Sequence, residues 1–489
     1  MTSSQFGEQG TAVRGALVGA VALSLGLAAL VCADPFALPY FDFAWLRWFP
    51  FELTACVFLA LVILAVMVMS GGWMWRHRDI IVAASMFSGA QMIGLNLLKL
   101  DPLEMVTVPV TLLWLALILT GQVGSLRTSG NLMMMGGFVF CALLPLVQAY
   151  PMLLAAGLAA LLVKFVDYFL LTQFIRTRKG LDTALKGFMA VTVGSSIIGI
   201  LQVGLYMSTG IVFTLSDTME DLFKPTPFGQ MLRATALCPK PQHLAGFLIF
   251  GLPLLLFSAF EPGRTRGRRF LLLTGATLTC LALGLTWAVG AWMATCLVLL
   301  LFVYLRWPWR AIHVTVLLSL TVVLGWVSGL FQWVYARYLA HSGVLRGNEQ
   351  RLFLLSLALE KLQRSLWIGV GPRQFFRFDG NYRQFPVHNA YFQAATEAGL
   401  GGGILYAAIL GYAGVRLIYY CSTAGTPADQ RLCRMLLLAL FALSWNGMSE
   451  PVYDHSNTWV SLGLLEGAIL TLACRPRSTT ALSAATARG

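Results

Sequence analysis

The chain has 489 residues, of which 58% are hydrophobic and only 11% are charged, and its mean hydropathy is +0.74. Average usage is about 25% charged residues, so this composition excludes a soluble globular protein. The formal net charge of +13 does not indicate nucleic-acid binding, because most basic residues fall in short loops between apolar runs, where Lys and Arg set membrane orientation. We therefore expect an all-α polytopic membrane protein that lies in the lipid bilayer and binds no nucleic acid.

Apolar runs of about 20 residues, the length that crosses a bilayer as a helix, recur along the whole chain. The first begins at Gly15, after a polar N-terminal segment, and we expect it to be retained in the mature protein. The pattern predicts about fourteen transmembrane helices. They lie at 15–33, 51–71, 80–98, 105–124, 132–148, 152–171, 187–207, 243–260, 270–288, 291–305, 311–331, 390–418, 433–448 and 457–473.

Every second loop between these spans is basic. The basic segments are 75–79, 125–131, 176–180, 263–269, 306–310, 431–434 and the tail at 474–477. The intervening short loops are poor in Lys and Arg. Because cytoplasmic loops carry the excess of Lys and Arg, we expect both termini in the cytoplasm.

This topology divides the chain into six regions and places two long loops outside. The regions are N-terminal transmembrane helices at 1–207, an outer loop at 208–242, transmembrane helices at 243–331, a large outer loop at 332–389 that we expect to be catalytic, C-terminal transmembrane helices at 390–473 and a cytoplasmic tail at 474–489. The large loop is basic against the trend, but long loops are translocated largely regardless of charge. Its charge predicts a site for an anion.

The large outer loop combines a helical pattern with arginines and aromatic residues. Residues 351–366 have helical spacing and predict a surface helix across the outer face. One stripe of this helix holds Leu352, Leu355, Leu359 and Leu362. After a glycine and proline turn at 369–372, Arg373 and Arg377 alternate with aromatic residues. Aromatic faces stack on sugars and arginine forks pair with phosphate oxygens, although the same residue types also anchor loops in lipid headgroups.

Two histidines lie at the outer ends of predicted spans. His388 and Asn389 directly precede the span at 390–418, and an imidazole that is mostly neutral at pH 7 accepts a proton from a hydroxyl. A structural boundary histidine is the alternative. In the smaller outer loop, Arg233 is a second cation that could face the larger loop, whereas we interpret His243 as a helix-start residue.

The remaining polar chemistry gives little indication of a metal or another cofactor. Nine cysteines are scattered singly, without the Cys and His spacing that zinc requires. The larger outer loop has no paired acidic motif, and Asp217, Glu220 and Asp221 of the smaller one are weak grounds for Mg²⁺. We therefore expect no metal, no cofactor and no disulfide framework.

The sequence that begins at His388 resembles the H-N-x9-G-x-x-G signature of the bacterial O-antigen ligases, which the O-antigen and exopolysaccharide polymerases share loosely. Upstream runs are similar to further elements of that family, an arginine followed by a proline, then R-x-x-L, then W-x-G-V-G-x-x-x-F. The matching positions are Arg233, Pro241, Leu244, Ala245, Arg351, Leu354, Trp367, Gly369, Val370, Gly371, Phe375, His388, Asn389, Gly399 and Gly402. The resemblance covers 230–405 in detail. It departs from the family at Gln242 and His243, where asparagine more often follows the proline, so it assigns no role to His243.

The resemblance implies a GT-C-like bundle in the bacterial cytoplasmic (inner) membrane that works as a metal-independent glycosyltransferase at the periplasmic face. The donor would be a glycan on undecaprenyl diphosphate, and the acceptor a sugar hydroxyl on a glycolipid or a growing glycan. By the same resemblance, Arg233 and Arg351 would bind the donor diphosphate, and His388 would take the proton of the acceptor or orient its hydroxyl. Residues expected to support the site or the acceptor are Asn389, Arg373, Arg377 and Tyr391.

Three functions remain open at this point. A ligase would join a finished polysaccharide to lipid A-core, and a polymerase would extend a chain with the same donor chemistry; the close fit of the His-Asn signature favours the ligase. The third is a transporter or lipid-glycan flippase, which would place ionisable residues at the bilayer midplane. The predicted spans hold few such residues, chiefly Lys164, Asp167, Glu397 and Glu466. The concentration of charge in the outer loops favours an enzyme.

Overall fold

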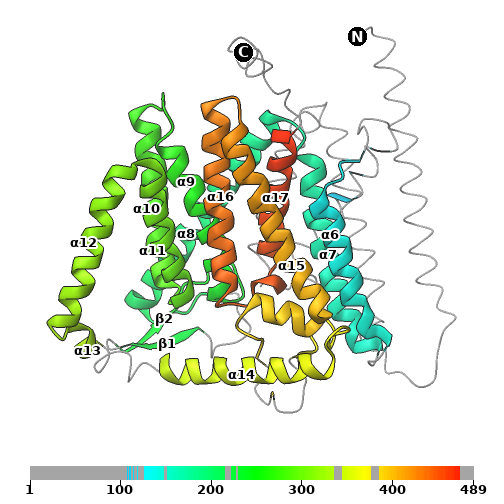
Figure 1. Ribbon diagram of the computed structural model, residues 1–489. Helices are drawn as coiled ribbons and strands as arrows, with labels where there is room; N and C mark the ends of the chain where they lie inside the picture. Colours follow the sequence, from blue (N-terminus) through cyan, green and yellow to red (C-terminus); the bar gives the residue numbers. More distant parts are fainter. Residues whose placement is uncertain are drawn as a thin grey trace, which may run out of the picture.

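The structure of the protein, a computed structural model, consists almost entirely of helices (Figure 1). It describes residues 126–147, 151–214, 222–226, 229–334, 344–375, 381 and 385–473, with five further positions between 107 and 118. The elements are α6 (Gly130–Leu143), η1 (Leu144–Val147), α7 (Pro151–Phe174), α8 (Arg178–Thr209), β1 (Phe223–Thr226), β2 (Gly229–Leu232), α9 (Pro241–Ala259), α10 (Arg266–Leu285), α11 (Val289–Arg306), α12 (Pro308–Val327), α13 (Leu330–Val334), α14 (Val344–Arg364), α15 (Ala390–Thr423), α16 (Pro427–Gly447), η4 (Val452–Asp454) and α17 (Ser456–Ala473).

Each predicted span from 132–148 onward coincides with a helix. Within the described part of the chain, six helices are long and apolar enough to cross a membrane, namely α8, α9, α10, α11, α12 and α15. A helix that is apolar on all sides is buried in a protein core or in lipid. The chain is therefore a helical membrane protein. The count of fourteen stays a prediction, because the spans predicted before residue 126 lie outside the described residues apart from five helical positions.

Several helices begin where a hydroxyl or amide side chain satisfies the first free N–H groups. The N-cap side chains that accept such a hydrogen bond are Ser129 of α6, Thr177 of α8, Thr265 of α10, Asn389 of α15 and Thr426 of α16. A cap of this kind stabilises a helix by about 1 kcal/mol. The caps fix the helix starts at the loops between apolar runs.

Helices α9 and α17 form the interior of the bundle, and nearly all of their residues are buried. Helix α17 approaches α7 closely because it presents glycines four residues apart. A Cβ at Gly463 would lie 3.0 Å from the carbonyl oxygen of Tyr168, and one at Gly467 would lie 2.9 Å from Cβ of Ile175. Small residues at this spacing allow helix backbones to pack closely in membranes.

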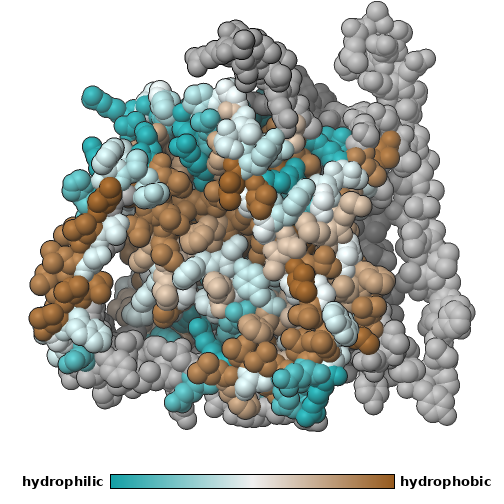
Figure 2. Space-filling view, in the orientation of Figure 1, coloured by the Kyte–Doolittle hydropathy of each residue, from teal (hydrophilic) through white to brown (hydrophobic). Residues whose placement is uncertain are grey.

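Figure 2 shows a broad apolar band across the middle of the visible face, with hydrophilic residues at both ends of the bundle. Helix α12 leans away from the other long helices in Figure 1 and packs chiefly against α11. Its large apolar side chains are exposed on several sides, among them Val316, Leu320, Val323 and Trp326. An apolar band of this kind between polar ends suits burial in a bilayer.

The chain reverses at each step from α8 to α12 and again from α15 to α17 (Figure 1). The basic segments 176–180, 263–269, 306–310 and 431–434 therefore meet at one end of the bundle. The described parts of 208–242 and 332–389 meet at the other end, as the loop parity predicts. Which end faces the periplasm stays a prediction.

The end that holds the two long loops also carries structure beyond the expected all-α class. Helix α14 lies across it, nearly perpendicular to the spans (Figure 1). The smaller loop contains an antiparallel hairpin, β1 and β2, in which Phe223 pairs with Leu232 and Lys224 with Met231. The predicted surface helix is present but begins at Val344 and ends at Arg364. The described residues thus agree with the expected all-α membrane class and add one small two-stranded sheet to it.

Candidate active site

Helix α14 packs on the segment that leads into α15 through a small apolar cluster of its own. From α14 this cluster takes Leu354, Leu357 and Ala358, which meet Phe375 and Val387. The leucines of the stripe noted in the sequence do not form this cluster, since Leu352 is 66% exposed and Leu359 40% exposed. The helix turns its 354–358 face inward instead, because the following loop folds back beneath it. This packing fixes Arg351, one turn before the cluster, above the start of α15.

The loop after α14 is joined to a kink in α15 by backbone hydrogen bonds. The N–H of Val370 donates to the carbonyl of Thr396 at 3.0 Å, and the N–H of Gly371 donates to the carbonyl of Glu397 at 2.8 Å. In return, the N–H of Leu400 donates to the carbonyl of Leu366 at 2.8 Å. These three hydrogen bonds run in both directions and join the loop after α14 to the kink in α15. We call this contact the junction.

Two glycines make this junction possible. Gly399 interrupts α15 with φ 73° and ψ 171°, and a Cβ there would lie 2.2 Å from the carbonyl oxygen of Trp367. Gly369 has φ 77°, and its Cβ would lie 2.3 Å from the backbone nitrogen of Gly399. A side chain is excluded at both positions by the positive φ and by contact with backbone. The glycines of the resemblance therefore serve the close approach of loop and helix.

Glu397 is fully buried beneath the junction and accepts hydrogen bonds from three directions. Its carboxylate accepts the N–H of Arg373 at 2.8 Å, Nε2 of Gln393 at 3.1 Å and the hydroxyl of Tyr453. Arg373 has φ 59°, and its side chain is exposed. The structure thus gives Arg373 a backbone role in the junction, and Arg377 lies outside the described residues.

Asn389 ties three segments together at the entrance to α15. Its Oδ1 accepts the N–H groups of Tyr391 and Phe392, both at 3.0 Å, and its Nδ2 donates to the carbonyl of Met448 at 3.1 Å. Tyr391 adds a second tie, since its hydroxyl donates to the carbonyl of Ser444 at 3.0 Å. Both residues hold α15 against the end of α16, so their geometry is that of supports.

The residue that these ties bring to the site is Glu450, which follows α16. Its Oε1 lies 3.3 Å from Nη2 of Arg351, and its Oε2 lies 3.6 Å from Nδ1 of His388. The second distance exceeds that of a hydrogen bond but is within ion-pair range. Only 3% of the Glu450 side chain is exposed, against 21% of His388 and 38% of Arg351. A buried carboxylate therefore lies between the predicted base and one predicted diphosphate ligand.

The pKa of Glu450 is below its ordinary value. Burial alone would raise the pKa of the carboxyl, but the neighbouring His388, Arg351 and His455 outweigh burial. Glu450 is consequently ionised at neutral pH. Its negative charge offsets the positive charge of Arg351 and would stabilise a protonated His388.

Two further cations approach the same place from the smaller loop. Arg233 is 8% exposed, and its Nε donates to the carbonyl of Thr286, at the end of α10, at 2.8 Å. Lys224 of β1 is half-buried, and its pKa is lowered by burial and by the charges of Arg233 and Arg351, while Glu450 raises it. Lys224 thus lies within electrostatic reach of both predicted diphosphate ligands and of the carboxylate. The hairpin of the smaller loop and α14 of the larger one supply a single cationic group.

Two more histidines border this group. The rings of His243 and His455 lie 3.7 Å apart between centroids, and the carbonyl of His243 accepts Nδ2 of Asn457 at 3.2 Å. His243 begins α9, as the sequence predicts, and it also joins the start of α17 through this ring contact. His455 is the nearer of the two to the chemistry, because its charge lowers the pKa of Glu450.

Sequence reasoning missed Glu450, Lys224 and His455. Glu450 and His455 lie in the short segment 449–455 between the last two predicted spans, which has the same loop parity as the two long loops. The presence of an acid and a histidine in so short an outer loop could have indicated a functional role for both residues. Lys224 gave no signal, since a single lysine in a polar loop is ordinary.

The residues around Glu450 supply what a transfer from a diphosphate donor requires, namely cations and a proton acceptor. Arg233 and Arg351, from two loops, both lie within electrostatic reach of Lys224, and such cations suit phosphate oxygens. An imidazole beside a buried carboxylate suits acceptance of a proton. Within the described chain, no group of three or more His, Cys, Asp or Glu side chains is arranged to hold a metal ion. Independence from metal stays a prediction.

Comparison with known protein families gives a match in the middle of the chain. Residues 245–407 match the sequence model of the family described as O-antigen ligase. The matched stretch contains Arg351, His388 and Gly399, whereas Arg233 and Glu450 lie outside it. No curated protein matches the chain. The match confirms the family resemblance predicted from the sequence.

Proposed function

On the premise that the chain carries an O-antigen ligase domain at residues 245–407, we propose that it transfers a glycan from undecaprenyl diphosphate to a sugar hydroxyl. The acceptor is a glycolipid such as lipid A-core, and the reaction takes place at the periplasmic face of the inner membrane. The observation that carries the proposal is the position of buried Glu450 between His388 and Arg351. These three residues come from separate parts of the chain, and their meeting needs a chemical reason.

The donor end of the reaction requires neutralisation of charge. As the bond between C1 of the sugar and the diphosphate oxygen breaks, negative charge develops on the leaving diphosphate. Arg351 and Arg233 would hold its oxygens, and Lys224 would add a third cation from the hairpin. Glu450 pairs with one Nη of Arg351, and the other donors of that guanidinium would bind the diphosphate.

The acceptor end requires removal of a proton. With Nδ1 of His388 directed at Glu450, its Nε2 is the atom that would take the proton as the acceptor oxygen attacks C1. The carboxylate would then stabilise the imidazolium by its opposite charge. The proton afterwards passes to solvent, and undecaprenyl diphosphate leaves as the second product.

The charges inside the spans support an enzyme over a transporter. In the interior, Glu466 accepts hydrogen bonds from Asn131 at 2.8 Å and from Arg416 at 2.7 Å. Asp167 accepts one from Thr107. These groups have partners within the bundle, as buried charges generally do.

A transfer assay tests the proposal. The purified full-length chain is given a lipid-linked glycan donor together with either lipid A-core or a second lipid-linked glycan. Product on lipid A-core supports the ligase function. Extension of the glycan on the second donor would show the polymerase function instead. Absence of transfer to either acceptor, with donor bound, contradicts both.

Orientation is tested separately by labelling single cysteines in a cysteine-free background. A cysteine at Gln363 on α14 should react with a membrane-impermeant maleimide in intact spheroplasts, and one at Arg268 on α10 should react only after lysis. The reverse pattern would place the Glu450 group on the cytoplasmic side and exclude a periplasmic reaction.

A further inference from the structure

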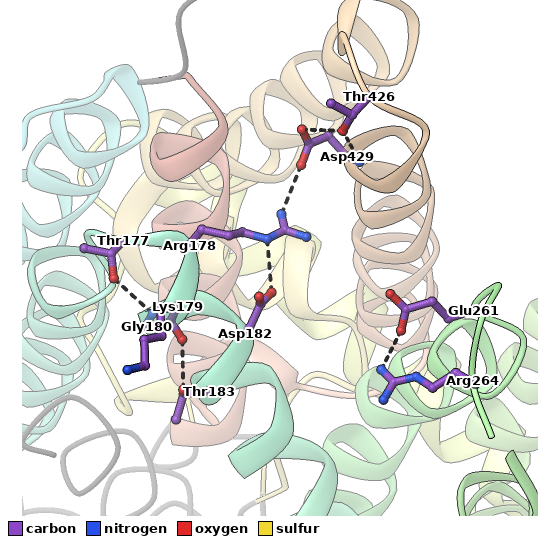
Figure 3. Close-up of polar contacts among 10 residues, drawn as sticks. All are labelled: Thr177, Arg178, Lys179, Gly180, Asp182, Thr183, Glu261, Arg264, Thr426 and Asp429. Atoms are coloured by element: carbon purple, nitrogen blue, oxygen red, sulfur yellow. Dashed lines mark hydrogen bonds and ion pairs between the residues drawn. The ribbon is translucent and has the colours of Figure 1, made fainter. Parts of the chain in front are cut away.

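A second polar site lies at the opposite end of the bundle from the Glu450 group. It is a cavity of about 200 Å³ between the start of α8, the end of α9 and the start of α16. Figure 3 shows three ion pairs around it, of which the Arg178–Asp429 pair joins the start of α8 to the start of α16. The residues with charge that line it are Arg178, Asp182, Lys186, Glu261, Arg264 and Arg431. Nothing in the proposed glycan transfer uses this cavity.

The acids of the cavity are already matched by arginines. Arg178 pairs with Asp182 at 3.1 Å within α8 and with the buried Asp429 of α16 at 3.2 Å. Asp429 is held in turn, because it accepts the hydroxyl of Thr426 at 2.8 Å. Arg264 pairs with Glu261 at 2.5 Å (Figure 3).

Two cations remain after this matching. Lys186 and Arg431 line the cavity from α8 and α16, and neither has an ion-pair partner among the described residues. With Asp429 beside Arg178 included, four cations stand against three acids, so the cluster carries a net charge of +1. A cavity with this balance attracts an anion.

The inner wall of the same cavity is apolar. Its apolar lining residues are Leu185, Met189, Phe257, Leu432 and Met435. Along α8, Leu185 and Met189 lie further from the helix start than Arg178 and Asp182, and along α16 Leu432 and Met435 follow Arg431. A ligand that carries an anionic group and hydrocarbon satisfies both parts, whereas a free inorganic anion satisfies only the rim.

We propose that this cavity binds the phosphate of an anionic phospholipid, with Lys186 and Arg431 as its cations and the apolar wall against its acyl chains. Basic pockets between transmembrane helices take such headgroups. Arg178 and Arg264 shape the rim through their ion pairs. The bound lipid would connect α8 to α16 beside the Arg178–Asp429 pair.

Native mass spectrometry of the full-length chain in detergent tests this proposal. Phosphatidylglycerol and phosphatidylcholine are added in parallel, and the double variant Lys186→Gln/Arg431→Gln is compared with wild type. We expect wild type to retain phosphatidylglycerol over phosphatidylcholine and the double variant to lose at least 10-fold in phosphatidylglycerol affinity. The matched control is Arg266→Gln/Arg268→Gln, which removes two exposed cations from the start of α10 at the same end and should retain wild-type binding.

The outcomes separate the sources of the anion. Equal retention of both lipids, or equal loss in the two double variants, overturns the proposal. If the cavity binds inorganic phosphate at millimolar concentration but does not retain phosphatidylglycerol, its ligand is a free phosphate. That result also overturns the lipid proposal. Because the measurement is lipid binding and not glycan transfer, its result is independent of the proposed function.

Discussion

Oε2 of Glu450 lies 3.6 Å from Nδ1 of His388, and the carboxylate is almost wholly removed from solvent. The two residues precede different helices, α17 and α15, and the side chain of Asn389 holds those segments together. A buried carboxylate next to a histidine stabilises the protonated ring. The pair supports the proposed role of His388 as the acceptor of a proton.

The first prediction follows from this pair. Glu450→Gln keeps the shape of the side chain but removes its charge, so the imidazolium loses its stabilising neighbour. We expect turnover to fall at least about 10-fold with donor binding retained, measured as initial rates with saturating donor. Glu360→Gln on α14, an exposed acid paired with Arg364, is the control and should keep wild-type turnover. Equal rates for Glu450→Gln and wild type would remove Glu450 from the mechanism.

A second prediction concerns Arg351. Arg351→Ala should abolish measurable transfer by loss of donor binding, and Arg351→Lys should restore it only in part, because an ammonium lacks the planar fork. Binding of purified lipid-linked donor is the measurement. Arg364→Ala removes an exposed arginine of the same helix and should bind donor normally. Wild-type donor affinity in Arg351→Ala would show that α14 does not contribute to the donor site.

Gly399 gives a prediction about stability. A Cβ at this position would lie 2.2 Å from a backbone carbonyl and would sit on a residue with φ 73°. Gly399→Ala should therefore destabilise the fold by more than about 2 kcal/mol. The measurement is the apparent Tm in detergent. Gly411→Ala in the same helix has open space and should change Tm little, so similar shifts in both variants would contradict the close junction.

The sequence predicts some parts of the fold and of the candidate site better than others. Apolar runs predict helices well, because a span must satisfy its backbone internally, and the positions from α6 to α17 agree with them. The His-Asn and glycine motif predicted His388 and the junction glycines. The hairpin at Phe223–Leu232 was missed because two four-residue strands leave almost no periodic signal.

The inward face of α14 could not be predicted from the sequence, for a physical reason. Leucines fill two sides of this helix, and a membrane-surface helix can expose Leu352 and Leu359 to lipid while Leu354 packs inward. Hydrophobic periodicity alone does not tell which side meets protein. Glu450 was missed because its partners lie far away in sequence and only the tertiary fold brings them together.

A fourth prediction uses the pKa of Lys224. That pKa is lowered by burial and by Arg233 and Arg351, so the charge of Lys224 is present at neutral pH and is lost as pH rises through a value below that of an ordinary lysine. Donor affinity should accordingly weaken on the alkaline side, starting below about pH 10.4. Lys224→Arg keeps its charge and should extend binding to higher pH, while Lys179→Arg at the other end of the bundle should leave the profile unchanged. Identical alkaline profiles for wild type and Lys224→Arg would exclude Lys224 from the donor site.

The most direct test of the central claim is the turnover of His388→Ala with purified lipid-linked donor and acceptor, with donor binding measured in the same preparation. General-base catalysis is typically worth about 10²–10⁴-fold. The proposed mechanism predicts a loss of that size in turnover while donor affinity stays near wild type, because Arg233, Arg351 and Lys224 remain. Wild-type turnover in His388→Ala with donor bound would show that His388 is a boundary residue and would contradict the mechanism.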